Sequence, residues 1–156
     1  MNNQSLISII RSAHDGLLRT VSTVPDDKMN WKPLDNGRTV LDLLGDAAQT
    51  AGMTAQMALT HGEVKPSYEM FQQLRAERQN WTREDAMREL DESTQKLYAA
   101  IGQMSDEELG KMVTAEVGGG MTLPLSAWMM MAHRTFISRF AQINYIQTLY
   151  GDFESH

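Results

Sequence analysis

The chain has no cysteine and only four prolines among its 156 residues. The absence of cysteine excludes disulfides, thiolate metal sites and cysteine nucleophiles, and it predicts a protein of the reducing cytoplasm. No run of about 18 apolar residues is present to span a membrane, and the first residues lack the basic segment of a signal peptide. The net charge of −6 disfavours a nucleic-acid partner, because such binding depends largely on neutralising phosphates.

The remaining composition is typical of one helical globular domain. Hydrophobic residues make up 42% and charged residues 22% of the chain, which is too apolar for a disordered protein. Twelve methionines and the scarcity of proline favour helices. We therefore expect residues 1–156 to form a single all-α domain, since this length suits one hydrophobic core.

Four long segments place apolar side chains three and four residues apart, which puts them on one face of a helix. These helices are predicted over residues 5–24, 39–60, 82–104 and 124–150, with Ser5 and Thr82 as caps of the first and third. A short extra helix is expected within 66–77, between the second and third. The pattern predicts an antiparallel four-helix bundle whose exact topology this insert leaves open. The Gly118–Gly120 run fits no phosphate-binding motif and is expected to be a flexible loop or tight turn.

The last helix carries polar residues within its apolar stripe. At about 100° per residue, Arg139 lies inside the apolar arc, while Thr135 and Gln142 lie nearer its edge. An arginine in such a place must be paired or must reach out to water. Asp46 interrupts an apolar run on the second helix and is a candidate partner. Two interpretations remain open: Asp46 and Arg139 pair across the bundle with Thr135 and Gln142 completing the hydrogen bonds, or both reach solvent without touching.

The four histidines do not form a recognisable metal-binding pattern. No pair of histidines has the spacing that places two ligands on one helix face, and no nucleophile motif accompanies them. His14 is the one histidine whose position suits an inward orientation. The simpler interpretation is that it is a core or edge residue.

Several short motifs, in their order and spacing, resemble the DinB/YfiT-like superfamily of bacterial four-helix bundles. The first helix ends in Val-Pro-Asp-Asp-Lys, Trp31-Lys32-Pro33 follows, and Gly37-Arg38-Thr39-Val40 leads into the second helix. Near the end of the chain, Ala141-Gln142-Ile143 is followed by Gly151. The resemblance covers nearly the whole chain and implies a DinB-like bundle.

This resemblance also implies where a metal would be bound. Family members hold a divalent metal with three histidines, one about thirteen residues after the proline and two placed four apart on the last helix. The corresponding positions here are Asp46, Thr135 and Arg139, with Gln142 matching a glutamine of the pattern. A guanidinium group cannot bind a cation, so the resemblance favours an Asp46–Arg139 ion pair in place of the metal.

Three hypotheses for function follow. The first is a DinB-like protein without metal or cofactor that binds a small molecule or a protein partner, and is a homodimer as such bundles often are. The alternative is a divergent hydrolase or thiol S-transferase-like enzyme that uses the same inter-helix cavity, with Asp46 as acid/base and Arg139 as an anion clamp. The third is a metal enzyme that uses His14 with carboxylates the sequence does not place.

Overall fold

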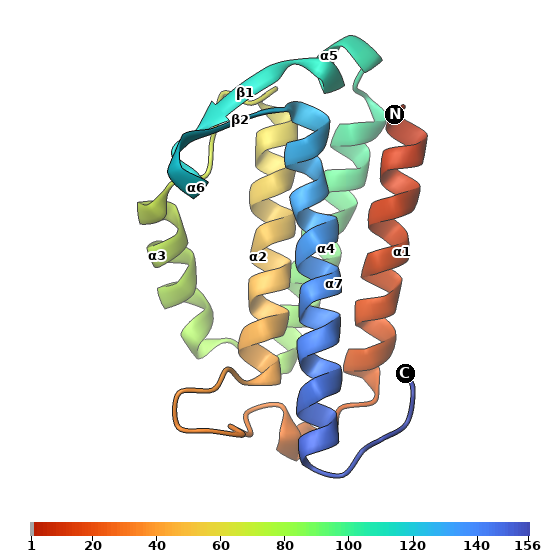
Figure 1. Ribbon diagram of the computed structural model, residues 1–156, viewed down its shortest axis with the longest axis vertical. Coiled ribbons are helices and arrows are strands. Elements are labelled where there is room, and N and C mark those ends of the chain that lie inside the picture. Colours follow the sequence, from red (N-terminus) through yellow and green to blue (C-terminus); the bar gives the residue numbers. More distant parts are fainter. Residues whose placement is uncertain (1) are drawn as a thin grey trace.

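The computed structural model describes residues 2–156 and consists mostly of helices (Figure 1). The four bundle helices are α1 (Asn3–Ser22), α2 (Val40–Leu59), α4 (Arg83–Gly102) and α7 (Leu125–Leu149). The shorter elements are the 3-10 turns η1 (Asp26–Lys28) and η2 (Arg78–Asn80), the helices α3 (Tyr68–Glu77), α5 (Asp106–Gly110) and α6 (Val117–Gly120), and the strands β1 (Met112–Ala115) and β2 (Met121–Pro124). The predicted four-helix bundle is confirmed, and α3 is the short extra helix expected between the second and third bundle helices.

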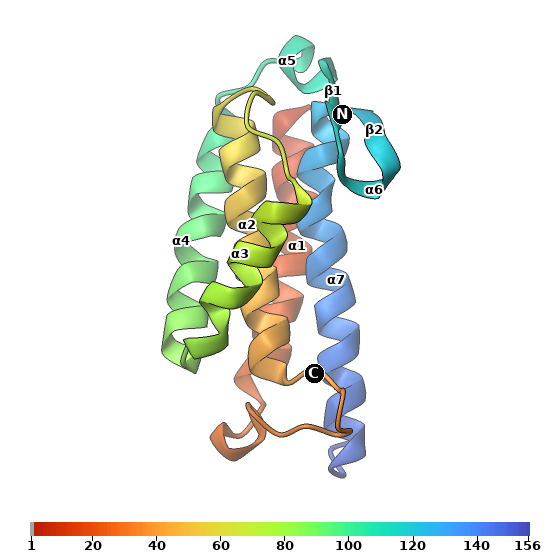
Figure 2. The same cartoon turned by 90° about the vertical axis from the view of Figure 1, so that its left-hand side faces the viewer.

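The four long helices are not antiparallel throughout. α1 and α2 both pack against α4 and α7, so α1 and α2 occupy opposite corners of the bundle. α3 runs back along the outside of α2, toward the end of the bundle where α2 begins (Figure 2). This return allows α4 to run parallel to α2. The expectation of an antiparallel bundle is therefore wrong for this pair of helices, and also for α1 and α7, which pack together and run in the same direction (Figure 1).

Side-chain caps determine where α1 and α4 begin. The side chain of Asn2 accepts a hydrogen bond of 2.9 Å from the backbone nitrogen of Ser5, so α1 starts two residues earlier than predicted and Ser5 is not its cap. At α4 the predicted arrangement is present, because Thr82 and Asp85 each accept a hydrogen bond from the other's backbone nitrogen. Each cap satisfies backbone N–H groups that have no partner within the helix.

Residues 112–124 form an antiparallel hairpin where the sequence predicted only a loop or tight turn. β1 pairs with β2 from Met112 opposite Pro124 to Ala115 opposite Met121. The chain reverses at Gly119 and Gly120, whose φ angles of 81° and 88° are readily adopted by glycine. The hairpin lies across the end of the bundle where α7 starts (Figure 1).

The long helices share one hydrophobic core, to which α7 contributes large side chains such as the fully buried Phe136. The neighbouring Ile137 faces outward and is 46% exposed. Within residues 2–156, no helix is both long and apolar enough to cross a lipid bilayer. The buried apolar residues of α7 pack against the other helices of the bundle.

Replacing Phe136 with alanine tests the packing of α7. We expect Phe136→Ala to lower the free energy of unfolding by about 3–5 kcal/mol, because it leaves a cavity in a core with no access to water. Ile137→Ala is the matched control on the exposed face of the same helix, with an expected change of about 0.5 kcal/mol. Urea titration followed by circular dichroism measures both, and equal losses would contradict this orientation of α7.

Candidate functional site

Asp46, in the first half of α2, lies at the centre of an ion-pair network. Its Oδ2 atom accepts two hydrogen bonds from Arg139 of α7, one from Nε at 2.8 Å and one from Nη2 at 2.6 Å. Its Oδ1 atom lies 3.3 Å from Nη2 of Arg78 and 3.7 Å from Nη2 of Arg38. One carboxylate thus contacts guanidinium groups from α7, from the turn after α3 and from the loop before α2.

Asp42 adds a second carboxylate to this network. It lies four residues before Asp46, and residues at that spacing project from the same face of a helix. Arg78 donates from Nε to Oδ1 of Asp42 at 2.8 Å, and Arg38 donates from Nε to its Oδ2. Three guanidinium groups therefore face two carboxylates, which leaves the network with an excess of positive charge.

The close approach of Arg78 to α2 depends on Gly45. A Cβ atom at Gly45 would lie 3.1 Å from Cδ of Arg78 and 3.3 Å from a ring carbon of Trp81. Arg78 also donates from Nη1 to Oε1 of Gln49 at 2.9 Å, and the Gln49 amide donates to the Leu74 carbonyl at 2.7 Å. These contacts attach the end of α3 to α2 and leave only 9% of the Arg78 side chain exposed.

The guanidinium group of Arg139 has all three of its nitrogens hydrogen-bonded. Besides the two bonds to Asp46, its Nη1 donates to Oε1 of Gln142 at 2.8 Å, one turn further along α7. The side chains of Arg139 and Asp46 are each 21% exposed, so water has little access to the pair. An ion pair with this geometry cross-links α2 to α7 in a fixed orientation.

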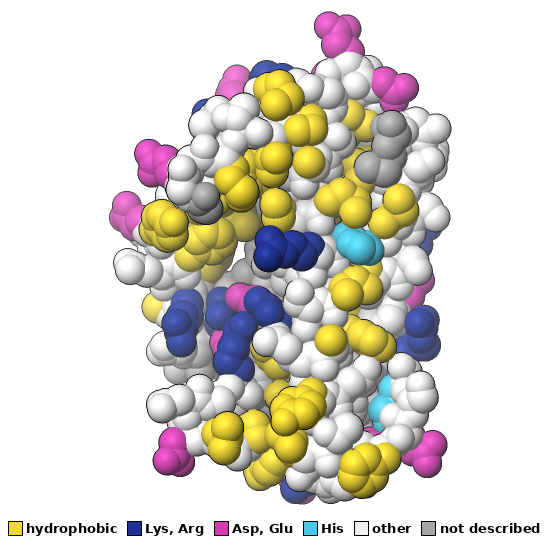
Figure 3. Space-filling view, viewed as in Figure 1, with side chains coloured by type: hydrophobic (Ala, Val, Ile, Leu, Met, Phe, Trp, Pro, Cys, Tyr) yellow, Lys and Arg dark blue, Asp and Glu magenta, His cyan; other side chains and the backbone are white. Residues whose placement is uncertain are grey.

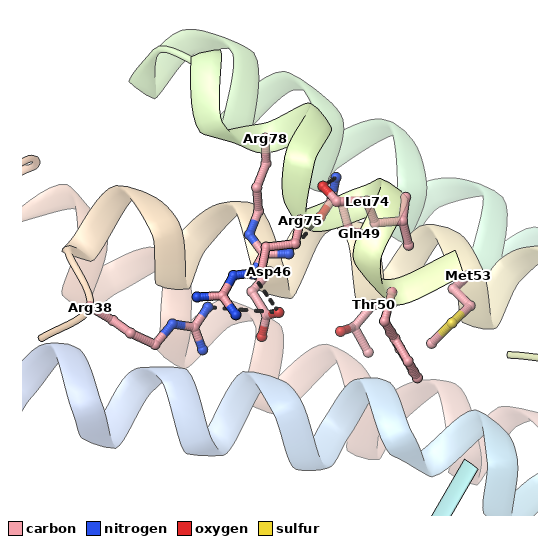
Figure 4. A pocket seen from close by; sticks show the side chains of 9 residues that line it. Arg38, Asp46, Gln49, Thr50, Met53, Leu74, Arg75 and Arg78 are labelled. Carbon is pink, nitrogen blue, oxygen red and sulfur yellow. Dashed lines mark hydrogen bonds and ion pairs between the residues drawn. The ribbon is translucent and has the colours of Figure 1, made fainter. Parts of the chain in front are cut away.

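Two adjoining cavities open beside Asp46, and together we call them the α3 groove. Their volumes are about 320 and 360 Å³, and both are lined by Asp46, Thr50, Met53 and Phe71. Figure 4 shows arginine side chains from α3 and from the loop before α2 at the Asp46 end of the smaller cavity. The larger cavity extends toward the hairpin and is mostly apolar. In Figure 3 a cluster of basic side chains and a neighbouring hydrophobic patch lie on this face of the molecule.

The sequence of this bundle matches that of a known protein family. A sequence model of the DinB superfamily matches residues 9–135. The chain belongs to the DinB superfamily. No curated protein matches this DinB chain.

The DinB fold of the chain is also found in two crystal structures of mycothiol-dependent maleylpyruvate isomerase, one of them a histidine-to-alanine mutant. The mutant matches with a TM-score of 0.76 and 19% sequence identity, and the other structure with a TM-score of 0.71 and 17% identity. Each match covers 92% of this chain and 61% of the isomerase chain. At these identities the similarity shows the fold, and the DinB chain spans less than two thirds of the isomerase.

The structure brings together the residues that the sequence singled out. The predicted contact between Asp46 and Arg139 is present, and the prediction that both reach solvent without touching is wrong. Gln142 completes the hydrogen bonds of Arg139 as expected. Thr135 lines the α3 groove beside them, but among the described residues its side chain makes no hydrogen bond to the pair.

Three members of the network were not predicted from the sequence, namely Arg38, Asp42 and Arg78. Asp42 had a usable signal, because it lies one helical turn before Asp46 on the same helix face. No sequence signal pointed to Arg78, because it reaches α2 only through the path that α3 takes back along the bundle.

The side chains at the positions that the resemblance assigns to metal ligands do not fit a divalent cation. A guanidinium group such as that of Arg139 only donates hydrogen bonds, and both oxygens of Asp46 already face guanidinium groups. Across residues 2–156, no group of three or more histidine, aspartate or glutamate side chains is arranged to hold a metal ion.

His14 faces inward as predicted, but it lies among core residues. It is 5% exposed, its Nδ1 atom is 3.3 Å from the hydroxyl of Tyr98, and its ring lies against Phe136. Burial lowers the pKa of His14 and raises the pKa of Tyr98 to about 12, so both groups are neutral near pH 7. Among the described residues, His14 belongs to no group of three or more histidine, aspartate or glutamate side chains that could hold a metal ion.

The coupling of Asp46 to Arg139 can be measured by removing one partner or both. We expect Asp46→Ala to lower the free energy of unfolding by about 1–3 kcal/mol, because it leaves partly shielded guanidinium groups facing one another. The double variant Asp46→Ala/Arg139→Leu should recover part of this loss, since it also removes one of the unpaired cations. Urea titration gives both values.

Asp26→Ala is the control for this experiment. Asp26 pairs with Arg83 at 2.8 Å, but its side chain is 92% exposed, so we expect a loss below about 1 kcal/mol. Equal free energies of unfolding for the single and double variants at Asp46 would contradict the coupling.

The charge state of Asp42 predicts a dependence of stability on pH. Burial raises the pKa of Asp42, but hydrogen bonds from Arg38 and Arg78 outweigh it, so the net pKa lies below the ordinary value of 3.8. Ionised Asp42 therefore stabilises the fold above pH 3.8, and this contribution is lost as the pH falls through the lower pKa of the folded state.

Comparison of the wild type with Asp42→Asn isolates this effect. The wild type should be the more stable protein near neutral pH, and its advantage should shrink as the pH falls below 3.8. Urea titrations over a series of pH values measure the difference in free energy of unfolding. A difference that stays constant into the acid range would show that Asp42 is not held ionised by the arginines.

Proposed function

We propose that this DinB protein is a metal-free protein that binds a small molecule in the α3 groove. The observation that carries the proposal is the Asp46–Arg139 ion pair, whose shortest contact is 2.6 Å, in the wall of that groove. A guanidinium group stands at a position that the resemblance assigns to a metal-ligating histidine. Loss of the metal site is therefore part of the proposal.

The shape and lining of the α3 groove support a ligand. Its two cavities, of about 320 and 360 Å³, each fall in the range of about 300–1,000 Å³ that is common for small-molecule sites. Apolar side chains such as Met53 and Phe71 lie next to arginines along it. Ligand sites commonly combine an apolar wall with a few polar groups that orient the ligand.

A divergent hydrolase or thiol S-transferase-like enzyme is the second candidate. Space for a substrate beside Asp46 and Arg139 favours it, as does the shared fold with a mycothiol-dependent isomerase. In this scheme Asp46 acts as acid/base and Arg139 binds an anionic group. Against it, both oxygens of Asp46 already contact guanidinium groups, which leaves this carboxylate poorly placed to take a proton from a substrate.

We further propose that residues 1–156 form a single domain. The protein is a homodimer and is located in the cytoplasm. The exposed apolar side chains of Leu34 and Tyr145, at 74% and 66% exposure, line a further shallow cavity beside α7 and support an interface between copies of the chain. The absence of cysteine supports the cytoplasmic location.

Two measurements test the proposed function together. Elemental analysis of protein purified without chelator should find well below one metal ion per chain. A thermal-shift screen of small organic acids, thiols and neutral compounds should find ligands that raise the melting temperature of the wild type, because a ligand that binds only the folded state stabilises it. The same compounds should have no effect on Thr50→Trp, in which the new side chain fills the α3 groove.

Ser12→Trp, on the exposed face of α1, is the control for an added indole. It should respond to the ligands as the wild type does. Stoichiometric tightly held metal would overturn the metal-free assignment, and ligands that stabilise Thr50→Trp as well as the wild type would place their site outside the groove.

A further inference from the structure

The charge of the α3 groove is opposite to that of the whole protein. The chain has 20 acidic and 14 basic residues, yet the groove is lined by five arginines and only one acid. The arginines are Arg38, Arg75, Arg78, Arg134 and Arg139, and the acid is Asp46. Such a concentration of one charge in a hollow attracts ligands of the opposite sign.

Two of the five arginines are not committed to the ion-pair network. Arg38, Arg78 and Arg139 all contact Asp42 or Asp46. Arg75 and Arg134 are exposed, and within the described chain neither has an acidic oxygen within 4 Å. Arg75 lies on α3 beside the smaller cavity, where Figure 4 shows it near Arg38 and Arg78. Its guanidinium group is thus available to a ligand.

The larger cavity of the groove is mostly apolar. From Met53 and Phe71, which the two cavities share, the larger cavity continues along further apolar side chains, among them Met57, Met121, Trp128 and Met131. Methionine side chains are flexible and polarisable, so they adapt to apolar ligands of irregular shape. An apolar wall of this extent gives a small inorganic anion nothing to contact.

We propose that the α3 groove binds an amphipathic organic carboxylate. The carboxylate group lies against Arg75, with Arg38 and Arg78 behind it, and the apolar body passes Phe71 toward Trp128. Arginine suits this role because its planar group donates two parallel hydrogen bonds to a carboxylate. The assignment rests on the proposed function, and it names the chemical class of the ligand in the same groove.

Dodecanoate, used below its micelle-forming concentration, is the probe for this assignment. Isothermal titration calorimetry should show saturable binding of dodecanoate, with affinity rising from octanoate to dodecanoate by up to about fourfold per methylene group. Dodecan-1-ol should bind more weakly, because it has the chain without the charge. Acetate should show no measurable binding, because it has the charge without the chain.

Arg75→Gln tests the position of the carboxylate group. This exposed side chain has no acid partner among the described residues, so the variant should fold normally and keep the wild-type melting temperature. Its dissociation constant for dodecanoate should rise about tenfold, since a charge-assisted hydrogen bond is lost. Arg19→Gln, at an exposed arginine of α1 outside the groove, is the matched control and should bind as the wild type does.

The outcomes separate this inference from the proposed function. Equal affinity for dodecan-1-ol and dodecanoate, or no effect of Arg75→Gln, overturns the carboxylate assignment but leaves binding in the groove intact. A larger loss in Arg134→Gln than in Arg75→Gln overturns the assigned orientation. Absence of dodecanoate binding, or binding that persists in Thr50→Trp, overturns the inference, whereas the proposed function fails only if the wider thermal-shift screen also finds no groove ligand.

Discussion

One carboxylate, that of Asp46, keeps three guanidinium groups from separate parts of the chain close together. Two unit charges 4 Å apart near a protein surface interact by about 4 kcal/mol, so without Asp46 these groups would strongly repel one another. From its position in the first half of α2, it cross-links this helix to α7 through Arg139 and to the end of α3 through Arg78. The arrangement of these three elements therefore depends on a small number of charged contacts.

The contacts that fix α3 also build the groove. Gly45 leaves space for Arg78 against α2, and Gln49 ties Arg78 to the backbone of α3. Held in this way, α3 returns the chain along the bundle, which makes α4 parallel to α2, and its Phe71 lines both cavities. The unusual direction of α4 and the presence of a groove thus have a common origin in the packing of one ten-residue helix.

The extents of the long helices could be predicted because apolar spacing and local capping depend on residues close in sequence, as at Thr82 and Asp85. The partner of Arg139 could also be predicted, since an arginine in an apolar stripe needs a neutralising group and Asp46 was the acid within the apolar run of α2. The role of Arg78 could not be predicted, because its partners depend on the path of α3 through space. The hairpin was missed for another reason: strands of four residues beside a glycine run are too short for an alternating pattern to stand out.

A metal ion and a guanidinium group can both neutralise a carboxylate between α2 and α7, but they leave different chemistry behind. A metal keeps an open position that can activate water or a thiol. Arg139 has no such position, because a guanidinium group cannot coordinate water or a thiol as a metal does, and each of its three nitrogens already donates a hydrogen bond to Asp46 or Gln142. In the proposed function, recognition of a ligand falls to the arginines outside the pair, above all Arg75, and the pair itself, whose two charges cancel, is a rigid part of the groove wall. This difference in chemistry is the reason that the proposed function is binding in the α3 groove.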